Sequence, residues 1–152
     1  MAAAASPERP RPAERAEFSR FVPLTTRWLD NDVYGHLNNV VYYAFFDTAV
    51  NQILIQEAVL DPLKSPIVGL VVDTHCTYFR SLTFPDAIEA GVRTLAIGTS
   101  SVRYAIGIFS GENPAAAAQG QFTHVYVDRA SQRPVPIPAD LRKVIEALRN
   151  EA

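Results

Sequence analysis

Residues 40–60 form an almost unbroken apolar segment, and this segment constrains the fold more than any other part of the chain. Five of its few polar side chains recur at helical spacing: Asp47, Thr48, Asn51, Gln52 and Gln56. The pattern predicts a helix with one narrow polar face, about 30 Å long if the segment is helical throughout. The remaining faces are apolar and need to be covered by protein. We therefore expect this helix to lie in the middle of a domain.

The segments on either side of the predicted helix have the composition of strands. Residues 18–28 predict a first strand, in which Pro23 favours an edge position or a bulge. Four more strands are expected after the helix, at residues 67–79, 86–97, 100–109 and 117–127, and a short amphipathic helix at residues 139–148. The short separators between these strands favour antiparallel hairpins. This order predicts an α+β fold in which an antiparallel sheet wraps around the long helix.

Length and composition favour one domain. The chain has 152 residues, of which 48% are hydrophobic, enough for a single core. Residues 1–17 are rich in Ala, Pro, Arg and Glu, so we expect a disordered leader before a domain at residues 18–152, and a cytosolic protein without membrane association. The net charge of -2 and the lack of a basic, aromatic run argue against nucleic-acid binding. The single cysteine, Cys76, has no neighbour that would lower its pKa and is not expected to be a nucleophile.

Polar side chains crowd together between residues 30 and 42, directly before the apolar helix. Asp32 is the main candidate: a partly desolvated carboxylate can act as nucleophile or general base. The alternative is an aspartate that only caps or forms an Asx turn, which is the role we expect for Asp30. His36 can orient water, protonate a leaving group or bond to Asp32. Its alternative is a histidine hydrogen-bonded to backbone carbonyls.

The start of the helix offers backbone groups as well as side chains. Asn38 and Asn39 are suitable helix-cap residues, and free N–H groups at a helix start can form an oxyanion hole. Tyr42 belongs to an aromatic group expected in the core, although one member could line a tunnel at the helix start. No histidine or cysteine spacing matches a zinc site, so we expect no metal. His75 and His124 lie on predicted strands and are expected to have local partners.

A spaced motif runs through the polar cluster and into the helix, and a proline-rich segment follows much later. It reads Asp30-x-Asp32-x-x-Gly35-His36-x-Asn38-Asn39-x-x-Tyr42, then Phe45-Phe46-Asp47 and finally Arg133-Pro134-Val135-Pro136-Ile137-Pro138. It resembles the 4-hydroxybenzoyl-CoA thioesterase family of hotdog proteins and the related acyl-ACP thioesterases, over residues 18–148. The resemblance implies a hotdog fold and hydrolysis of an acyl thioester carried on coenzyme A or on a carrier protein. Coenzyme A is then part of the substrate, and no cofactor is expected.

The resemblance also implies roles for individual residues. Asp32 takes the position of the catalytic carboxylate, His36 that of the histidine in the acyl-ACP branch, and the Asn39 N–H that of the carbonyl-polarising amide. Tyr34 stands where the acyl-ACP branch has an asparagine, and the helix glutamate of a second catalytic arrangement is not evident. The residues expected to contact substrate are Tyr34, Asn38, Tyr42 and Arg80. The candidate cations for the coenzyme phosphates are Arg80, Arg93, Arg103 and Lys64, and the sequence does not decide among them.

Two other functions stay open at this point. The first is an acyl-CoA hydratase or dehydratase of the same fold, whose motif has a proline and one more residue between aspartate and histidine. The second is a non-catalytic acyl-CoA-binding protein. A single curved sheet leaves one face and one edge uncovered, so we expect a homodimer or a dimer-of-dimers tetramer.

Overall fold

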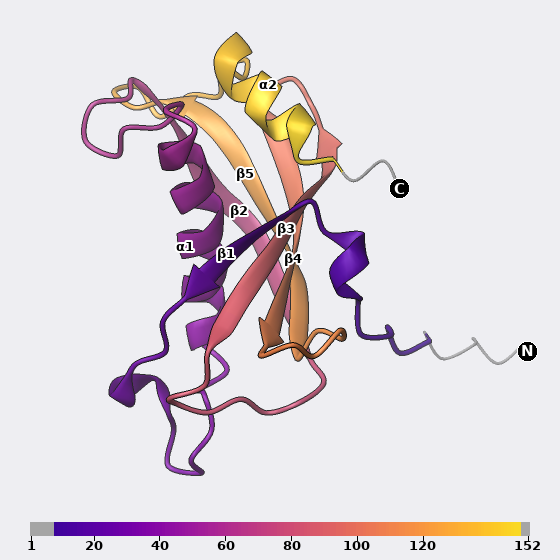
Figure 1. The fold of residues 1–152 in the computed structure, drawn as a ribbon. Coiled ribbons are helices and arrows are strands. Elements are labelled where there is room, and N and C mark those ends of the chain that lie inside the picture. Colours follow the sequence, from indigo (N-terminus) through magenta and orange to yellow (C-terminus); the bar gives the residue numbers. More distant parts are fainter. Residues whose placement is uncertain (1–7, 150–152) are drawn as a thin grey trace, which may run out of the picture.

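The computed structural model describes residues 8–149 as a five-stranded antiparallel sheet curved around one long helix, α1 (Val41–Gln56). The strands are β1 (Arg20–Leu24), β2 (Ile67–Tyr78), β3 (Ile88–Ile97), β4 (Ser101–Ser110) and β5 (Ala118–Asp128), in the spatial order β1-β3-β4-β5-β2. A second helix, α2 (Ala139–Ala147), lies at one end of the sheet (Figure 1). The predicted antiparallel sheet around a central helix is confirmed. No helix among the described residues is long and apolar enough to cross a membrane.

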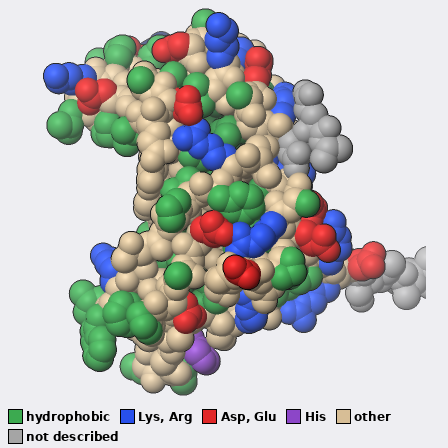
Figure 2. All heavy atoms as spheres, in the orientation of Figure 1, with side chains coloured by type: hydrophobic (Ala, Val, Ile, Leu, Met, Phe, Trp, Pro, Cys, Tyr) green, Lys and Arg blue, Asp and Glu red, His purple; other side chains and the backbone are tan. Residues whose placement is uncertain are grey.

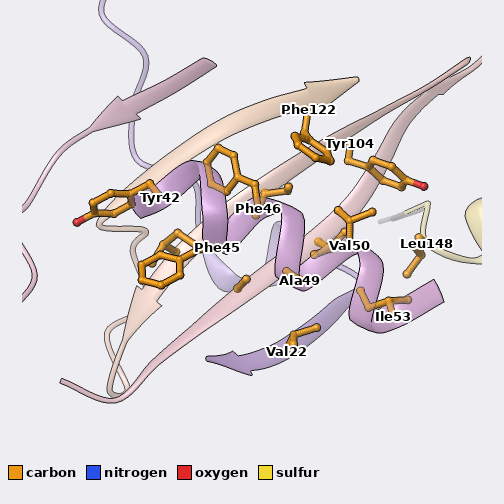
Figure 3. Close-up of a cluster of buried hydrophobic side chains, with 14 of the residues drawn as sticks. Val22, Tyr42, Phe45, Phe46, Ala49, Val50, Ile53, Tyr104, Phe122 and Leu148 are labelled. Atoms are coloured by element: carbon orange, nitrogen blue, oxygen red, sulfur yellow. The ribbon is translucent and has the colours of Figure 1, made fainter. Parts of the chain in front are cut away.

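The core lies between α1 and the concave face of the sheet. Helix α1 buries one side against the strands (Figure 3): Tyr42, Phe45, Phe46, Ala49, Val50, Ile53 and Leu54. The ring of Phe46 approaches β5 at Gly120, where an added Cβ would come within 2.8 Å of the ring and 1.9 Å of the His75 carbonyl oxygen. Glycine at this position therefore lets the helix pack closely on the sheet. Thr48 and Gln56 are exposed on the predicted polar face.

The first strand is shorter than predicted. It ends at Leu24, and residues Trp28–Asp30 form a 3₁₀ turn instead of continuing the strand. The Asp30 carboxylate accepts a hydrogen bond from the Arg27 N–H at 2.8 Å. The aspartate therefore supplies a local turn bond that competes with an extended strand.

Part of the expected disordered leader is packed on the sheet. The Ala116 N–H donates to the Ala13 carbonyl oxygen at 2.9 Å, and the Arg15 N–H donates to the Pro114 carbonyl oxygen at 3.0 Å. The Arg15 guanidinium also pairs with Glu89 and lies 4.9 Å from the centroid of the Phe109 ring. Residues 13 and 15 of the expected leader thus contact the rest of the domain, through partners that lie far away in the sequence. Residues 1–7 lie outside the described residues.

Strand β2 forms one edge of the sheet and is unusually exposed for an apolar strand. In the described chain its neighbour is β5 alone, and Leu70, Val71 and Val72 are 39%, 43% and 60% exposed. Figure 2 shows further hydrophobic side chains on the surface near both ends of α1. The most exposed of these are Leu63 after the helix and Trp28, Leu29, Val33 and Tyr34 before it. An edge of this kind is suited to pairing with another strand.

Candidate active site

The loop between the 3₁₀ turn and α1 is fixed at its start by Asp30. The Asp30 side chain is only 1% exposed, and its second oxygen accepts from Nε and an Nη of Arg27 at 3.0 and 2.8 Å. The Asp30 carbonyl oxygen accepts from the Asn38 N–H at 2.8 Å. This confirms the structural role predicted for Asp30.

A second set of hydrogen bonds ties the loop to residues 82–84. Asn31 donates to the Thr83 hydroxyl at 3.1 Å and accepts from the Phe84 N–H at 3.0 Å. The Thr83 hydroxyl in turn donates to the Gly35 carbonyl oxygen at 2.8 Å. Gly35 has a φ of +81°, a backbone conformation that glycine adopts without steric cost. The loop is therefore held from both sides, which limits the motion of the side chains it carries.

Asp32 occupies the turn of this loop and is partly exposed. Its Oδ1 accepts from the Tyr34 N–H at 2.8 Å and from the His36 N–H at 3.3 Å. This is the Asx turn that stood as the alternative interpretation of Asp32. The other carboxylate oxygen accepts no hydrogen bond from residues 8–149. One oxygen thus fixes the carboxylate, and the second is available for chemistry.

The asparagines at the helix start have different roles. Asn38 closes the turn that leads into α1, since its side-chain oxygen accepts from the Val40 N–H at 3.3 Å and its carbonyl from the Val41 N–H at 2.9 Å. The Asn39 carbonyl oxygen accepts from the Tyr78 hydroxyl at 2.7 Å. The Asn39 N–H donates no hydrogen bond within the described part of the chain. The N-cap of α1 is Val40 and carries no side-chain cap bond, so Asn38 and Asn39 do not cap the helix as predicted, and Asn39 keeps a free donor.

A cleft of about 300 Å³ lies where the loop, the start of α1 and the end of β2 meet. Five of the seven predicted site residues line it: Asp32, His36, Asn39, Tyr42 and Arg80. Arg80 donates to the Ser110 hydroxyl at 2.8 Å. The His36 side chain is exposed, and its ring nitrogens have no hydrogen-bond partner in residues 8–149. The cleft therefore combines a carboxylate, an imidazole, a free amide donor and a cation.

The other two predicted residues do not line the cleft. Tyr34 is 82% exposed at the tip of the loop, and Asn38 is engaged in the turn before the helix. Of the four predicted phosphate-binding cations, Arg80 alone lines this cleft. The structure adds Tyr78 and Ser81, which sequence analysis missed. No local pattern marks them, because they reach the helix start only through the curvature of the sheet.

Two tyrosines and the cysteine near the cleft stay protonated at neutral pH. Burial raises the pKa of Tyr42 to about 12 and raises the pKa of Tyr78 further. Their rings pack edge to face with centroids 5.0 Å apart. Burial also raises the pKa of the Cys76 thiol to about 11, which agrees with the prediction that it is not a nucleophile. Within residues 8–149, no three His, Cys, Asp or Glu side chains are grouped to hold a metal ion.

Comparison with known proteins gives consistent matches. A sequence model of the thioesterase-like superfamily matches residues 26–145. The crystal structure of the PA5185 protein from Pseudomonas aeruginosa strain PAO1 is 49% identical, with a TM-score of 0.91 over 94% of this chain and 99% of that one. A thioesterase from Thermus thermophilus, complexed with coenzyme A and Zn, is 29% identical, with a TM-score of 0.73 over 90% of this chain and 98% of that one.

One curated relative also matches, the uncharacterized protein YsmA of Bacillus subtilis (strain 168). It is 25% identical over 88 residues, which are 58% of this chain. The match spans about 59% of the length of YsmA. Together with the sheet order and the central helix, the comparisons confirm the predicted hotdog fold.

Proposed function

Because the chain belongs to the thioesterase-like superfamily, we propose that it hydrolyses acyl thioesters of coenzyme A or of an acyl-carrier protein. One observation carries the proposal. Asp32, His36 and Asn39 line one cleft at the start of α1, and the Asn39 N–H and one Asp32 oxygen have no partner within residues 8–149. A carboxylate, an imidazole and a free N–H can serve acyl transfer as general base or nucleophile, proton donor and oxyanion-binding donor.

In the proposed mechanism, the thioester carbonyl oxygen accepts a hydrogen bond from the Asn39 N–H. The positive end of the α1 dipole lies at the same place and stabilises the negative charge that develops on that oxygen. Asp32 then attacks the carbonyl carbon, or takes a proton from a water molecule that attacks it. The carbon–sulfur bond breaks, and His36 supplies the proton that the leaving thiolate accepts. Water hydrolyses the anhydride intermediate if Asp32 is the nucleophile.

The coenzyme or carrier portion has its own requirement, because its phosphates need a cation. Arg80 lines the cleft and is our proposed phosphate contact. The bond from Arg80 to the Ser110 hydroxyl orients its guanidinium. The related Thermus thermophilus thioesterase that was crystallised with coenzyme A supports this class of substrate for the present chain.

Asp32→Asn is the sharpest test, because asparagine keeps the Oδ1 acceptor of the Asx turn and removes the charge. We expect kcat for thiol release from a panel of acyl-CoA esters to fall by about 10³-fold, with little change in melting temperature. Asp61→Asn is the matched control: Asp61 Oδ1 accepts from the N–H groups of Leu63 and Lys64 at 2.9 and 3.1 Å, away from the cleft. Near wild-type hydrolysis by Asp32→Asn would refute the assignment.

The same panel separates the two other functions left open by the sequence. Hydration of an enoyl-CoA without thiol release would identify a hydratase. Tight binding of an acyl-CoA without turnover would identify a binding protein. Either result would contradict the proposal even if Asp32 proved important.

The oligomer is the second part of the proposal: two copies pair through their β2 edges, and these dimers can associate further. The exposed apolar strand supports the first contact, and the apolar surface around Trp28 and Tyr34 is available for a second one. Val72→Lys places a charge on the edge and should shift the sedimentation mass toward one chain. Leu63→Lys changes an even more exposed apolar residue outside the strand and should leave the mass unchanged. A monomeric wild-type protein would contradict this part.

A further inference from the structure

A pocket of about 220 Å³ opens on the convex face of the sheet, the face turned away from α1. Successive side chains of a strand point to opposite faces, so Gln121, which lines the pocket, points away from the core in which Phe122 is buried. The N-terminal segment lies on this side of the sheet (Figure 1), and Pro10 and Phe18 form part of the pocket wall. The pocket shares no lining residue with the cleft that holds Asp32, so it is a separate site.

The register of the sheet explains why a pocket forms at this place. One row of paired residues crosses β2, β5, β4 and β3, and its members are His75, Gln121, Ala105 and Arg93. Neighbouring strands are about 4.8 Å apart, so Gln121 and Arg93 flank the small Ala105 side chain at a separation of about 10 Å. Alanine thus forms a low floor between two long polar side chains.

The Phe18 ring closes one side of the pocket. The next row of the sheet has Gly107 on β4 and Gly91 on β3. A Cβ added to either glycine would lie 2.8 Å from an atom of the Phe18 ring. The two glycines therefore let the ring lie directly on the sheet, where its centroid is 5.9 Å from the guanidinium carbon of Arg93.

The polar side chains that line the pocket all carry hydrogen-bond donors. They are His75, Thr77, Arg93, Gln119 and Gln121, and no Asp or Glu side chain of the described residues lines it. Gln119 is already engaged, because its amide accepts from the Ala13 N–H and donates to the Arg11 carbonyl oxygen. The other four side chains can turn N–H or O–H groups toward a ligand. This lining favours a ligand with several acceptor oxygens and a negative charge.

Arg93 supplies the positive charge of the pocket. It is half-buried, its Nε has no hydrogen-bond partner within residues 8–149, and it forms no ion pair with them. Glu17 does not fill this role, since its two oxygens accept from Arg11 at 3.0 and 3.1 Å. The pKa of Glu17 is lowered first by that hydrogen bonding and least by Arg93. A half-buried guanidinium has lost part of its hydration, and an oxyanion would replace it with charge-assisted hydrogen bonds.

We propose that this pocket binds a free small oxyanion, a phosphate or a carboxylate, over the Ala105 floor, between Arg93 on one side and Gln121 and His75 on the other. Sequence analysis placed Arg93 among the candidate cations for the coenzyme phosphates, but it lies on the opposite face of the sheet from α1 and does not line the cleft. The proposed thioesterase activity therefore does not need this site, and the site does not depend on that activity. A bound anion contacts three strands and the wall formed by the N-terminal segment.

Calorimetric titration with inorganic phosphate tests the site on the full-length protein. We would use about 0.15 M sodium chloride, because a Debye length of about 8 Å screens isolated surface charges. Arg93→Gln removes the charge and keeps a side-chain amide, so the affinity for phosphate should fall about tenfold or more. Arg103→Gln is the matched control: Arg103 is an exposed arginine on the same face that does not line the pocket, and the affinity should stay unchanged. Ala105→Leu fills the floor without changing any charge, so it should also weaken binding and provides a second variant if Arg93→Gln does not fold.

Amide chemical shifts locate the bound anion. Phosphate should shift the N–H signals of His75, Gln121 and Arg93 and leave that of Asn39 in the cleft unchanged. No phosphate binding, equal losses in Arg93→Gln and Arg103→Gln, or shifts confined to the cleft would each overturn the proposal. Coenzyme A distinguishes a free anion from the phosphates of the proposed substrate. Phosphate should still bind when coenzyme A is saturating, and competition between the two would overturn the separate site. Loss of the proposed hydrolase function would leave the phosphate result standing.

Discussion

The two ends of α1 use the same residue type in opposite environments. At the amino end, His36 is exposed on a loop held by hydrogen bonds, beside a carboxylate and a free amide. At the carboxyl end, His124 is buried among aromatic rings beside an apolar cavity. Burial lowers the pKa of His124 to about 4, so this desolvated imidazole stays neutral. The first environment suits proton transfer, and the second makes the histidine part of the aromatic core.

The largest expected difference between these two ends is in pH-dependent stability. Folded His124 stays neutral down to about pH 4, and the unfolded chain takes up this proton near pH 6.5. Between these values the unfolded state binds more protons, so the free energy of unfolding falls as the pH drops from 6.5 toward 4. The loss is about 3 kcal/mol for one such histidine.

Urea denaturation of wild type and His124→Phe across this pH range measures that loss. Carboxylates titrate in both proteins, so their contribution cancels in the difference. The aromatic neighbours Tyr104, Phe122 and Tyr126 carry no charge in this range. If the two curves run parallel, the histidine is not held neutral by burial.

The next largest effect separates the two aspartates of the loop. Both oxygens of Asp30 accept hydrogen bonds from Arg27. Asparagine at position 30 turns an NH₂ group toward one of these donors, so Asp30→Asn should lower the free energy of unfolding by about 2 kcal/mol. Asp32→Asn keeps the one oxygen that accepts hydrogen bonds, so it should change the free energy of unfolding by less than about 0.5 kcal/mol. Equal losses in urea denaturation would mean that Asp32 is also mainly structural.

Tyr78→Phe tests the support of the amide at the helix start with a smaller effect. It removes the hydroxyl that donates to the Asn39 carbonyl oxygen at 2.7 Å. We expect about 1 kcal/mol less stability, and a lower kcat with little change in KM, since the bond orients Asn39 without holding substrate. Thermal denaturation and steady-state kinetics check the two effects. A change confined to KM would instead place Tyr78 in substrate binding.

Sequence patterns predicted the helices and strands in which apolar and polar residues alternate with regular spacing. The central helix was expected at residues 40–60 and extends over Val41–Gln56, and β2 begins at the expected residue. The features that were missed depend on contacts between distant residues. Arg15 is ordered by Glu89 and the Phe109 ring, and Tyr78 reaches the cleft through the sheet. A local pattern cannot contain this information.

A local pattern also failed to predict where the central helix ends. This end gives the prediction with the smallest expected change in stability. The sequence has no glycine there, so the pattern overestimated the helix by several residues. Ala58 takes a left-handed conformation with a φ of +58°, and the Val59 N–H donates to the Leu54 carbonyl oxygen at 3.0 Å. Alanine is strained in this conformation and glycine is not, so Ala58→Gly should raise the free energy of unfolding by about 0.5–1 kcal/mol. Glycine at the helical position of Ala49 should instead be destabilising. Urea denaturation distinguishes the two, and a loss of stability in Ala58→Gly would mean that the segment after α1 gains more from a stiff backbone than from relief of strain.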